Sequence, residues 1–348
     1  MTRVSRFVFR SLAGIVAFPI IQSSAQAIVI NNTAGVQTAR DLGAPFTAVT
    51  ELSVGGGLCT GSLISQFYVL TAQHCIFNTN PSNVSVLFRD DDSFNTVLDE
   101  ISVTRIFDDS SNRLLDGTDV AVLELSNPAP GSITPLRLLS NTNNLSGSTV
   151  TTVGFGLNGV GSTGHQFTRD GRRWAAQNTI DLVGPAADVG GRIVGGSSNI
   201  FSTDFDSGAF ASNTLSNFGS SPVPLTNEGT TGPGDSGGPL LVNRNNEFLI
   251  AGVLSGGTTS TSTFGDISWW TGSEQYRSFL ELVGGQFVGG SRSSFVTAGT
   301  AGRGTSRSLS DRSDDSPESI PEPTSPFALM LLGAIGAGIV QMRRNRLN

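Results

Sequence analysis

The feature that most constrains this chain is a glycine-rich turn at residues 234–239, Gly-Asp-Ser-Gly-Gly-Pro, followed at once by an apolar run at 240–242. Glycines on both sides of a serine allow positive φ angles and let the backbone approach a ligand closely. Backbone N–H groups in such a turn can converge on one point, as an oxyanion hole requires. A serine hydroxyl is a weak nucleophile until a base removes its proton. The turn therefore predicts a histidine base elsewhere in the chain and a group that orients it.

The chain has two histidines, so the candidates for this base are few. His74 follows the apolar run 67–70, which predicts a strand end able to hold it rigidly. His165 lies in the glycine-rich stretch 161–165 and is expected to be a surface residue. Asp119 opens the apolar stretch 119–125 and is the candidate for a buried carboxylate beside the imidazole. The alternative is that the turn, a core histidine and a strand-leading aspartate never meet.

Three segments in chain order carry a family resemblance: residues 71–75 (Thr-Ala-Gln-His-Cys), 119–123 (Asp-Val-Ala-Val-Leu) and 234–239. Together they resemble the chymotrypsin/trypsin family of serine proteases, because other serine hydrolases carry their triads in different chain orders. The resemblance covers roughly residues 28–285. It implies an all-β fold of two packed antiparallel β-barrels (chymotrypsin-like) with a C-terminal helix and the active site in the cleft between the barrels.

The resemblance also implies a mechanism. Ser236 would attack the scissile carbonyl, His74 would carry the proton, and Asp119 would hold the imidazole tautomer. The N–H groups of Gly234 and Ser236 would form the oxyanion hole, and Asp235 would receive a freed N-terminal ammonium group. No cofactor or metal is expected.

Substrate-binding positions follow from the same resemblance. Ser255, Gly256 and Gly257 would pair with an extended peptide substrate by strand addition. Thr230 would form the floor of the specificity pocket, and because it is not an aspartate, a preference for Arg or Lys is not supported. Glu228 is close in sequence, but its direction is unknown, so specificity stays open.

Residues 1–27 have the three parts of a secretory signal: Arg3, Arg6 and Arg10, an apolar stretch at 12–21, and small residues at 25–27. A permanent anchor is a weaker interpretation because the apolar stretch is too short to span a bilayer. Removal of the signal would leave Ile28 as a possible activating terminus. The sequence at 192–196, Arg-Ile-Val-Gly-Gly, matches the family's usual activation site. Cutting there would separate triad members, so we interpret it as a loop or strand.

The two cysteines, Cys59 and Cys75, flank the predicted base. Export to an oxidising compartment favours a disulfide between them, and the resembling family has a bridge at this place. A metal or redox pair is the alternative. Gln73 stands where the family usually has alanine, so packing beside His74 is expected to differ. Three adjacent acids at 90–92 predict a solvated turn, with a calcium site as the minority interpretation.

The expected domains are a first barrel at about 28–130, containing strands at 84–88 and 101–106, and a second barrel at about 148–285. Apolar residues at i, i+3, i+4 and i+7 predict a helix over 273–283, with Ser273 as its cap. Residues 286–320 have the composition of a low-complexity linker. Residues 321–348 (Pro-Glu-Pro, a short transmembrane segment at 327–342, then arginines) resemble the PEP-CTERM sorting signal of bacterial surface proteins.

These end segments predict export across the bacterial inner membrane to the cell surface, the medium or the periplasm. A sorting enzyme acting on the tail is the expected partner, besides a peptide or protein substrate, and membrane association would be transient. A permanent single-span anchor is the alternative. All 21 basic residues are arginine, and the composition does not resemble that of a nucleic-acid binder, which would carry basic clusters on one face. The competing functions are a catalytically weak binding module on the same scaffold and an esterase using the same triad.

Overall fold

The structure is a computed structural model that describes residues 28–90, 96–108, 114, 116–166, 170–184, 186–189, 192–194 and 198–289. The predicted signal at 1–27, most of the acidic turn at 90–92, and the tail beyond 289 lie largely or wholly outside these residues. Among the described residues, no helix is both long and apolar enough to cross a membrane.

The first half is a closed barrel of six antiparallel strands, in the order β2-β3-β4-β7-β6-β5. Short apolar runs broken by tight turns produce it; Gly55 and Gly56 turn the β2–β3 hairpin with φ of 57° and 89°, angles that glycine adopts readily. The strands predicted at 84–88 and 101–106 are confirmed within β5 and β6. The bounds are β2 Val49–Val54, β3 Gly57–Ser65, β4 Tyr68–Thr71, β5 Val84–Asp90, β6 Thr96–Phe107 and β7 Ala121–Leu125.

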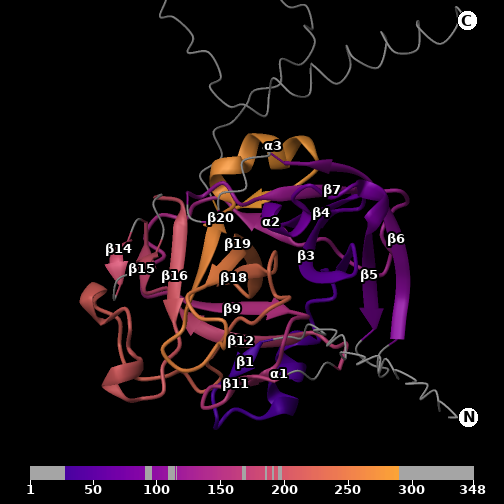
Figure 1. Cartoon of the computed structure of the whole chain (residues 1–348). Helices are drawn as coiled ribbons and strands as arrows, with labels where there is room; N and C mark the ends of the chain where they lie inside the picture. Colours follow the sequence, from indigo (N-terminus) through magenta and orange to yellow (C-terminus); the bar gives the residue numbers. More distant parts are fainter. Residues whose placement is uncertain are drawn as a thin grey trace, which may run out of the picture.

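The second half is a sheet in the order β12-β9-β18-β19-β20-β16-β13, which forms a half-barrel beside the first barrel (Figure 1). The short strands β8 Arg137–Leu139 and β21 Phe287–Val288 add to it through β19. The mostly β architecture confirms the predicted chymotrypsin-like double barrel. The bounds are β9 Thr149–Gly154, β12 Trp174–Thr179, β13 Leu182–Val183, β16 Ile200–Asp204, β18 Pro239–Arg244, β19 Glu247–Gly257 and β20 Ile267–Gly272.

One hydrophobic core joins the two halves. Ile64, Leu70 and Ala72 of the first barrel lie in the same buried cluster as Val153 and Leu241 of the second half. Removing this apolar surface from water stabilises the junction, at roughly 25 cal/mol per Å² buried. The segment that carries His74 begins directly after Ala72, so the shared core anchors it.

The N-terminal segment corrects the predicted domain boundary. β1 (Val29–Ile30) pairs with β17 (Gly229–Thr230) and with β10 (Gly159–Val160) rather than with the first barrel. The helix α1 (Val36–Gly43), which the sequence did not predict, packs through Ala39 on Trp174 of β12. Residues 28–43 therefore lie on the second half although they precede the first.

The C-terminal helix is present but shorter than predicted. It begins as the 3₁₀ turn η4 (Glu274–Tyr276) and continues as α3 (Arg277–Leu282). Ser273 is the N-cap residue of η4, as predicted, but its side chain makes no capping hydrogen bond, because its hydroxyl donates to the carbonyls of Ile250 and Ala251, each at 3.2 Å. β21 lies inside the range 286–320 that was assigned to a linker, so its first residues are a strand.

Short elements complete the described chain. The sequence at 192–196 contributes β15 (Arg192–Val194), which pairs with β14 (Ala186–Val189), in keeping with its interpretation as a loop or strand. His165 belongs to β11 (Gly164–His165), which pairs with β10, and is half-buried rather than in a free loop. The remaining elements are α2 Gln73–Ile76, η1 Pro81–Asn83, η2 Phe210–Ser212 and η3 Ser216–Phe218.

Buried carboxyls gather beside β16. Asp204 N–H donates to Asp181 Oδ2 at 3.1 Å, and Asp206 N–H donates to Glu228 Oε1 at 2.6 Å. Burial, together with the charge of Asp204, raises the pKa of Asp181 and of Asp206 to about 8. Burial also raises the pKa of Glu228 to about 7 and that of Asp204 above its ordinary value.

Because of these raised pKa values, we expect the free energy of unfolding to fall as pH rises from about 4 to 8. Across that range the folded state binds more protons than the unfolded state. Each group contributes a slope of up to about 1.4 kcal/mol per pH unit between its unfolded and folded pKa. Asp206→Asn should flatten the slope, measured by urea unfolding at several pH values. Asp41→Asn, at an exposed position, is the control. Equal slopes in both variants would contradict the assignment.

Candidate active site

His74 lies on the short helix α2, directly after β4 and Ala72. The next residue, Cys75, is joined to Cys59 of β3 by a disulfide, which confirms the predicted pairing. The bridge and the shared core hold the segment at the edge of the barrel, and His74 is half-buried. Gln73, the departure from the family pattern, is fully buried, and its Nε2 donates to Asp108 Oδ2 at 3.4 Å.

Asp119 contacts His74 at two points. Its Oδ1 accepts the His74 backbone N–H at 2.8 Å, and its Oδ2 lies 2.7 Å from His74 Nδ1. Because both carboxylate oxygens are acceptors, the proton of the neutral imidazole is held on Nδ1, which leaves Nε2 as the free acceptor. Asp119 is fully buried, while the His74 side chain is 23% exposed, so solvent reaches part of the imidazole although its carboxylate partner is shielded.

The loop before Asp119 is held by residues that the sequence reasoning missed. Tyr276 Oη and Gln275 Nε2 each donate to the carbonyl of Gly117 at 2.7 Å. Tyr276 lies within the range 273–283 that was predicted as a helix, and no sequence signal predicts that its hydroxyl reaches a loop 159 residues away. The C-terminal helix region therefore positions the carboxylate.

The Ser236 turn is bonded to both halves of the molecule. Ser236 O accepts Thr60 N–H of β3 at 2.8 Å, and Gly237 N–H donates to Leu254 O of β19 at 2.9 Å. Gly237 has a φ of 82°, and a Cβ there would lie 2.1 Å from Thr71 Oγ1, so the turn requires glycine at this position. Ser236 is therefore fixed at the junction of the barrel and the sheet.

Ser236 and His74 both lie close to the sulfur atom of Cys75. Cys75 Sγ lies 4.0 Å from His74 Nε2 and 3.5 Å from Ser236 O. Within the described part of the chain, Ser236 Oγ makes no hydrogen bond with His74. Catalytic hydrogen bonds in ligand-free structures are commonly long and tighten with substrate. The arrangement thus places an alcohol, an imidazole with a free Nε2 and a buried carboxylate at one site.

The N–H groups of Gly234 and Ser236 donate to no protein acceptor among the described residues, whereas those of Asp235, Gly237 and Gly238 are all bonded to carbonyls. Gly234 has a φ of 96°, a backbone conformation that glycine adopts readily and residues with a side chain rarely adopt. Two N–H groups beside a serine that donate no hydrogen bond within the described residues can bind a developing oxyanion.

Asp235 is buried beneath this turn. Its Oδ2 accepts N–H groups from Ile28 at 2.9 Å and Gly232 at 2.8 Å, and its Oδ1 accepts from Gly156 at 2.8 Å. Burial raises the pKa of Asp235 to about 7, and the three N–H donors oppose that rise. A Cβ at Gly154 would lie 2.1 Å from Oδ1, so the carboxylate occupies space that only glycine leaves open.

The predicted substrate-binding residues lie close together in the second half, since Gly257 pairs with Ser268 and the Thr230 hydroxyl contacts the same serine. Ser255, Gly256 and Gly257 end β19, with Gly257 exposed. Thr230 is buried, and its hydroxyl is 2.9 Å from Ser268 Oγ of β20. Glu228 does not face this region, because its two oxygens accept the N–H groups of Asp206 and Leu225, both at 2.6 Å.

No group of three His, Cys, Asp or Glu side chains in the described residues is arranged to hold a metal ion. Asp91 and Asp92, on which the minority calcium interpretation depends, lie outside those residues.

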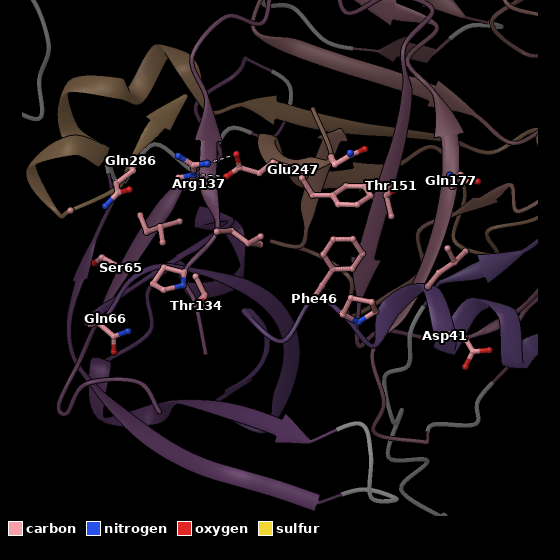
Figure 2. Close-up of a pocket in the computed structure, with 18 residues that line it drawn as sticks. Asp41, Phe46, Ser65, Gln66, Thr134, Arg137, Thr151, Gln177, Glu247 and Gln286 are labelled. Atoms are coloured by element: carbon pink, nitrogen blue, oxygen red, sulfur yellow. Dashed lines mark hydrogen bonds and ion pairs between the residues drawn. The ribbon is translucent and has the colours of Figure 1, made fainter. Parts of the chain in front are cut away.

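A cavity of about 910 Å³ lies elsewhere on the molecule, with walls from both halves (Figure 2). Phe46 lies within it and meets Phe248 edge to face at a ring distance of 4.9 Å. Arg137 and Glu247 form an ion pair at its wall. None of the three triad candidates is among its lining residues, so this cavity is separate from the candidate active site.

Comparison with known families agrees with this geometry. Residues 33–175 match the family model described as Trypsin. The match includes His74 and Asp119 and ends before Ser236, so it covers the closed barrel and the first strands of the second half. With the mostly β architecture and the closed six-stranded barrel, it supports a chymotrypsin/trypsin-like serine protease fold for this chain.

Proposed function

We propose that this protein is a serine endopeptidase that cleaves peptide bonds through an acyl-enzyme. The observation that carries the proposal is the two-point contact of Asp119 with His74, which holds the proton on Nδ1 and leaves Nε2 free beside the Ser236 turn. Acyl transfer requires a nucleophile, a base and an oxyanion hole. The serine, a histidine in that tautomer and the two N–H groups without an acceptor among the described residues supply these parts.

In the proposed reaction, Ser236 Oγ attacks the substrate carbonyl carbon while His74 Nε2 takes the hydroxyl proton. The N–H groups of Gly234 and Ser236 bind the oxyanion, and Asp119 stabilises the imidazolium that forms. His74 then gives the proton to the leaving amine as the peptide bond breaks. Water, deprotonated by the same nitrogen, hydrolyses the acyl ester and restores Ser236. Losing one oxyanion donor typically reduces kcat by about 10²–10³-fold.

A fluorophosphonate probe tests the proposal directly. We expect the exported protein to be labelled at Ser236, and Ser236→Ala to lose both labelling and peptide cleavage, with kcat reduced on the order of 10⁶-fold. Ser132→Ala, at an exposed position, is the matched control and should keep both. Unchanged labelling in Ser236→Ala would refute the proposal.

Two other functions are separated by the same experiment. A binding module with a weak site would give no labelling and no cleavage while the disulfide-bonded fold remains intact. An esterase would be labelled and would hydrolyse activated esters but leave peptides uncut. The presence of all three triad candidates favours an enzyme over the binding module, and the match of residues 33–175 to the Trypsin family model favours the peptidase over the esterase.

Signal removal after residue 27 would also create the activating terminus. Ile28 is fully buried with its nitrogen 2.9 Å from Asp235 Oδ2, and its φ of 33° is unfavourable for a β-branched residue within a continuous chain. Cleavage of the preceding peptide bond would remove that torsional constraint and turn the N–H into an ammonium group beside the carboxylate. N-terminal sequencing of the exported protein should therefore begin at Ile28. A start well downstream would end the idea.

Export to the cell surface, the medium or the periplasm completes the proposal, with residues 321–348 acting as a PEP-CTERM-like sorting signal and transient membrane contact. A sorting enzyme would remove this tail. Fractionation of cells that produce the full chain, with mass determination of the released protein, should give a form without the tail. A membrane-bound form of full length would support the permanent anchor instead.

A further inference from the structure

Thr60 of β3 contacts both residues whose N–H groups are proposed to bind the oxyanion. Its hydroxyl donates to the carbonyl of Gly234 at 3.0 Å, and its backbone N–H donates to the carbonyl of Ser236 at 2.8 Å. Thr60 is fully buried, whereas Gly234 and Ser236 are half-buried. One buried residue of the first barrel therefore holds the two positions of the turn at which the oxyanion is proposed to bind.

The direction of the Thr60 hydroxyl is fixed because the group both accepts and donates. Its oxygen accepts the N–H of Phe155 at 3.2 Å, so its single hydrogen is directed to the Gly234 carbonyl. Phe155 is buried, and the next residue, Gly156, donates its N–H to Asp235 Oδ1 at 2.8 Å. The hydroxyl thus joins three segments: β3, the residues after β9, and the serine turn.

Thr60 is itself held in the barrel. Its carbonyl accepts the Thr71 hydroxyl of β4 at 2.9 Å, and its neighbour Cys59 is bonded to Cys75. Threonine is branched at Cβ, which restricts its χ1 angle. The contacts with the turn therefore come from a rigid strand, next to the disulfide that also holds the segment of His74.

The turn depends on such contacts because Gly234 has no side chain to restrict it. Its φ is 96°, in the region that glycine adopts readily. The peptide unit that carries the Gly234 N–H is held on its carbonyl side, since Pro233 O accepts the Leu157 N–H at 2.8 Å. The peptide unit that follows Gly234 is held by the Thr60 hydroxyl. Loss of that hydroxyl would free this unit to rotate and would change the distance between the Gly234 and Ser236 N–H groups.

We propose that Thr60 is a positioning residue of the oxyanion hole, whose hydroxyl keeps the Gly234 and Ser236 N–H groups aimed at one point. Donors stabilise a developing charge best when they need no rearrangement as the reaction begins. Thr60 is buried and acts entirely through the turn, without contact to the reacting atoms. The inference deepens the proposed endopeptidase function and rests on it.

The first test compares Thr60→Val with Thr60→Ser in the exported protein, using the peptide that the wild type cleaves fastest in a random library. Thr60→Val keeps the shape of the side chain but leaves the Gly234 carbonyl and the Phe155 N–H without this partner, which is costly for buried polar groups. We expect kcat to fall on the order of 10–100-fold with little change in KM, because the oxyanion forms only after substrate binds. Thr60→Ser keeps the hydroxyl and should restore most of kcat.

Thr50→Val is the matched control. Thr50 is also a fully buried threonine of the first barrel, but its hydroxyl donates to the neighbouring carbonyl of Glu51, at 3.3 Å. Its removal should leave kcat and KM unchanged. A kcat in Thr60→Val equal to that of Thr50→Val would overturn the inference. Equal losses in Thr60→Val and Thr60→Ser would overturn it too, since they would show that the methyl group matters and the hydroxyl does not.

A second measurement isolates the oxyanion. Phenylboronic acid adds to a serine hydroxyl and forms a tetrahedral anion that resembles the transition state of acyl transfer. Its inhibition constant should rise in Thr60→Val by the same factor as kcat falls. Calorimetric binding of the uncleaved peptide to Ser236→Ala should be unchanged when Thr60→Val is added. Equal weakening of boronate and peptide would indicate a general loosening of the site and would contradict a role in the oxyanion hole.

Folding of the variants is followed by circular dichroism at the assay temperature. If Thr60→Val does not fold, Thr60→Ala removes the same hydroxyl with less bulk and carries the same expectation. In the wild type, the Phe155 amide should exchange slowly with deuterium, because its hydrogen bond to Thr60 is buried. Exchange at the rate of an exposed amide would overturn the inference without any variant.

Failure of the inference differs from failure of the proposed function. Fluorophosphonate labelling and peptide cleavage that are the same in wild type and Thr60→Val leave the peptidase standing and remove the role of Thr60. Absence of labelling and of cleavage in the wild type removes the peptidase itself, and the positioning role with it.

Discussion

Asp119→Asn should reduce kcat about 10⁴-fold with little change in KM, because it reverses the imidazole tautomer. In the native pair, Oδ1 accepts the His74 backbone N–H and Oδ2 faces Nδ1. An asparagine that keeps the first contact turns its NH₂ group toward Nδ1, so the ring proton must move to Nε2. The nitrogen that should take the Ser236 proton is then already protonated.

Steady-state kinetics and the rate of fluorophosphonate labelling both measure this effect, and both should fall by a similar factor. Asp99→Asn, an exposed substitution in β6, is the matched control and should leave both unchanged. The thermal midpoint of Asp119→Asn, followed by circular dichroism, separates loss of chemistry from loss of fold. A folded Asp119→Asn variant within tenfold of wild type would remove Asp119 from the triad.

Asp235→Asn in the processed protein should lower kcat/KM on the order of 10²–10³-fold. Removing one partner of a buried ion pair costs about 3–5 kcal/mol, since the other charge stays buried without compensation. Here the free Ile28 ammonium would be left beside an amide. The turn that presents the Gly234 and Ser236 N–H groups would lose its support, because Asp235 also accepts the N–H groups of Gly156 and Gly232.

The same contact predicts a dependence on the N-terminus. A preparation that retains residues 1–27 has a peptide N–H in place of the ammonium group and should label with fluorophosphonate far more slowly than the processed form. Asp41→Asn, an exposed acid on α1, serves as the control for Asp235→Asn. Equal labelling rates for the unprocessed and processed forms would show that Ile28 is not an activating terminus.

Local sequence was a reliable guide wherever local chemistry decides the structure. Short alternating runs predicted β5 and β6, and the expected export and the family resemblance predicted the disulfide between the two cysteines. The register of the strands, in contrast, depends on partners that are distant in the chain. Strands β12 and β16 show little alternation of apolar and polar residues, because most of their residues are buried.

Errors at the element ends have a similar cause. Serine is a residue type that commonly caps helices. The buried Ser273 hydroxyl instead donates to two carbonyls of β19. Residues 28–43 precede the first barrel and were assigned to it. Their apolar side chains, Ile28, Ile30 and Ala39, instead fill a gap against Trp174 of the second half.

By itself, the sequence determined which reactive groups are present and in what order: a serine in a glycine turn, a histidine and an aspartate at strand ends. These depend on residue type and on contacts within a few positions. Only the tertiary structure decided which distant groups meet. Ile28 reaches Asp235 across 207 residues, and the Thr60 hydroxyl reaches Gly234 across 174 residues. Such contacts arise from sheet pairing and burial, which bring together side chains whose separation along the chain carries no information about their distance in space.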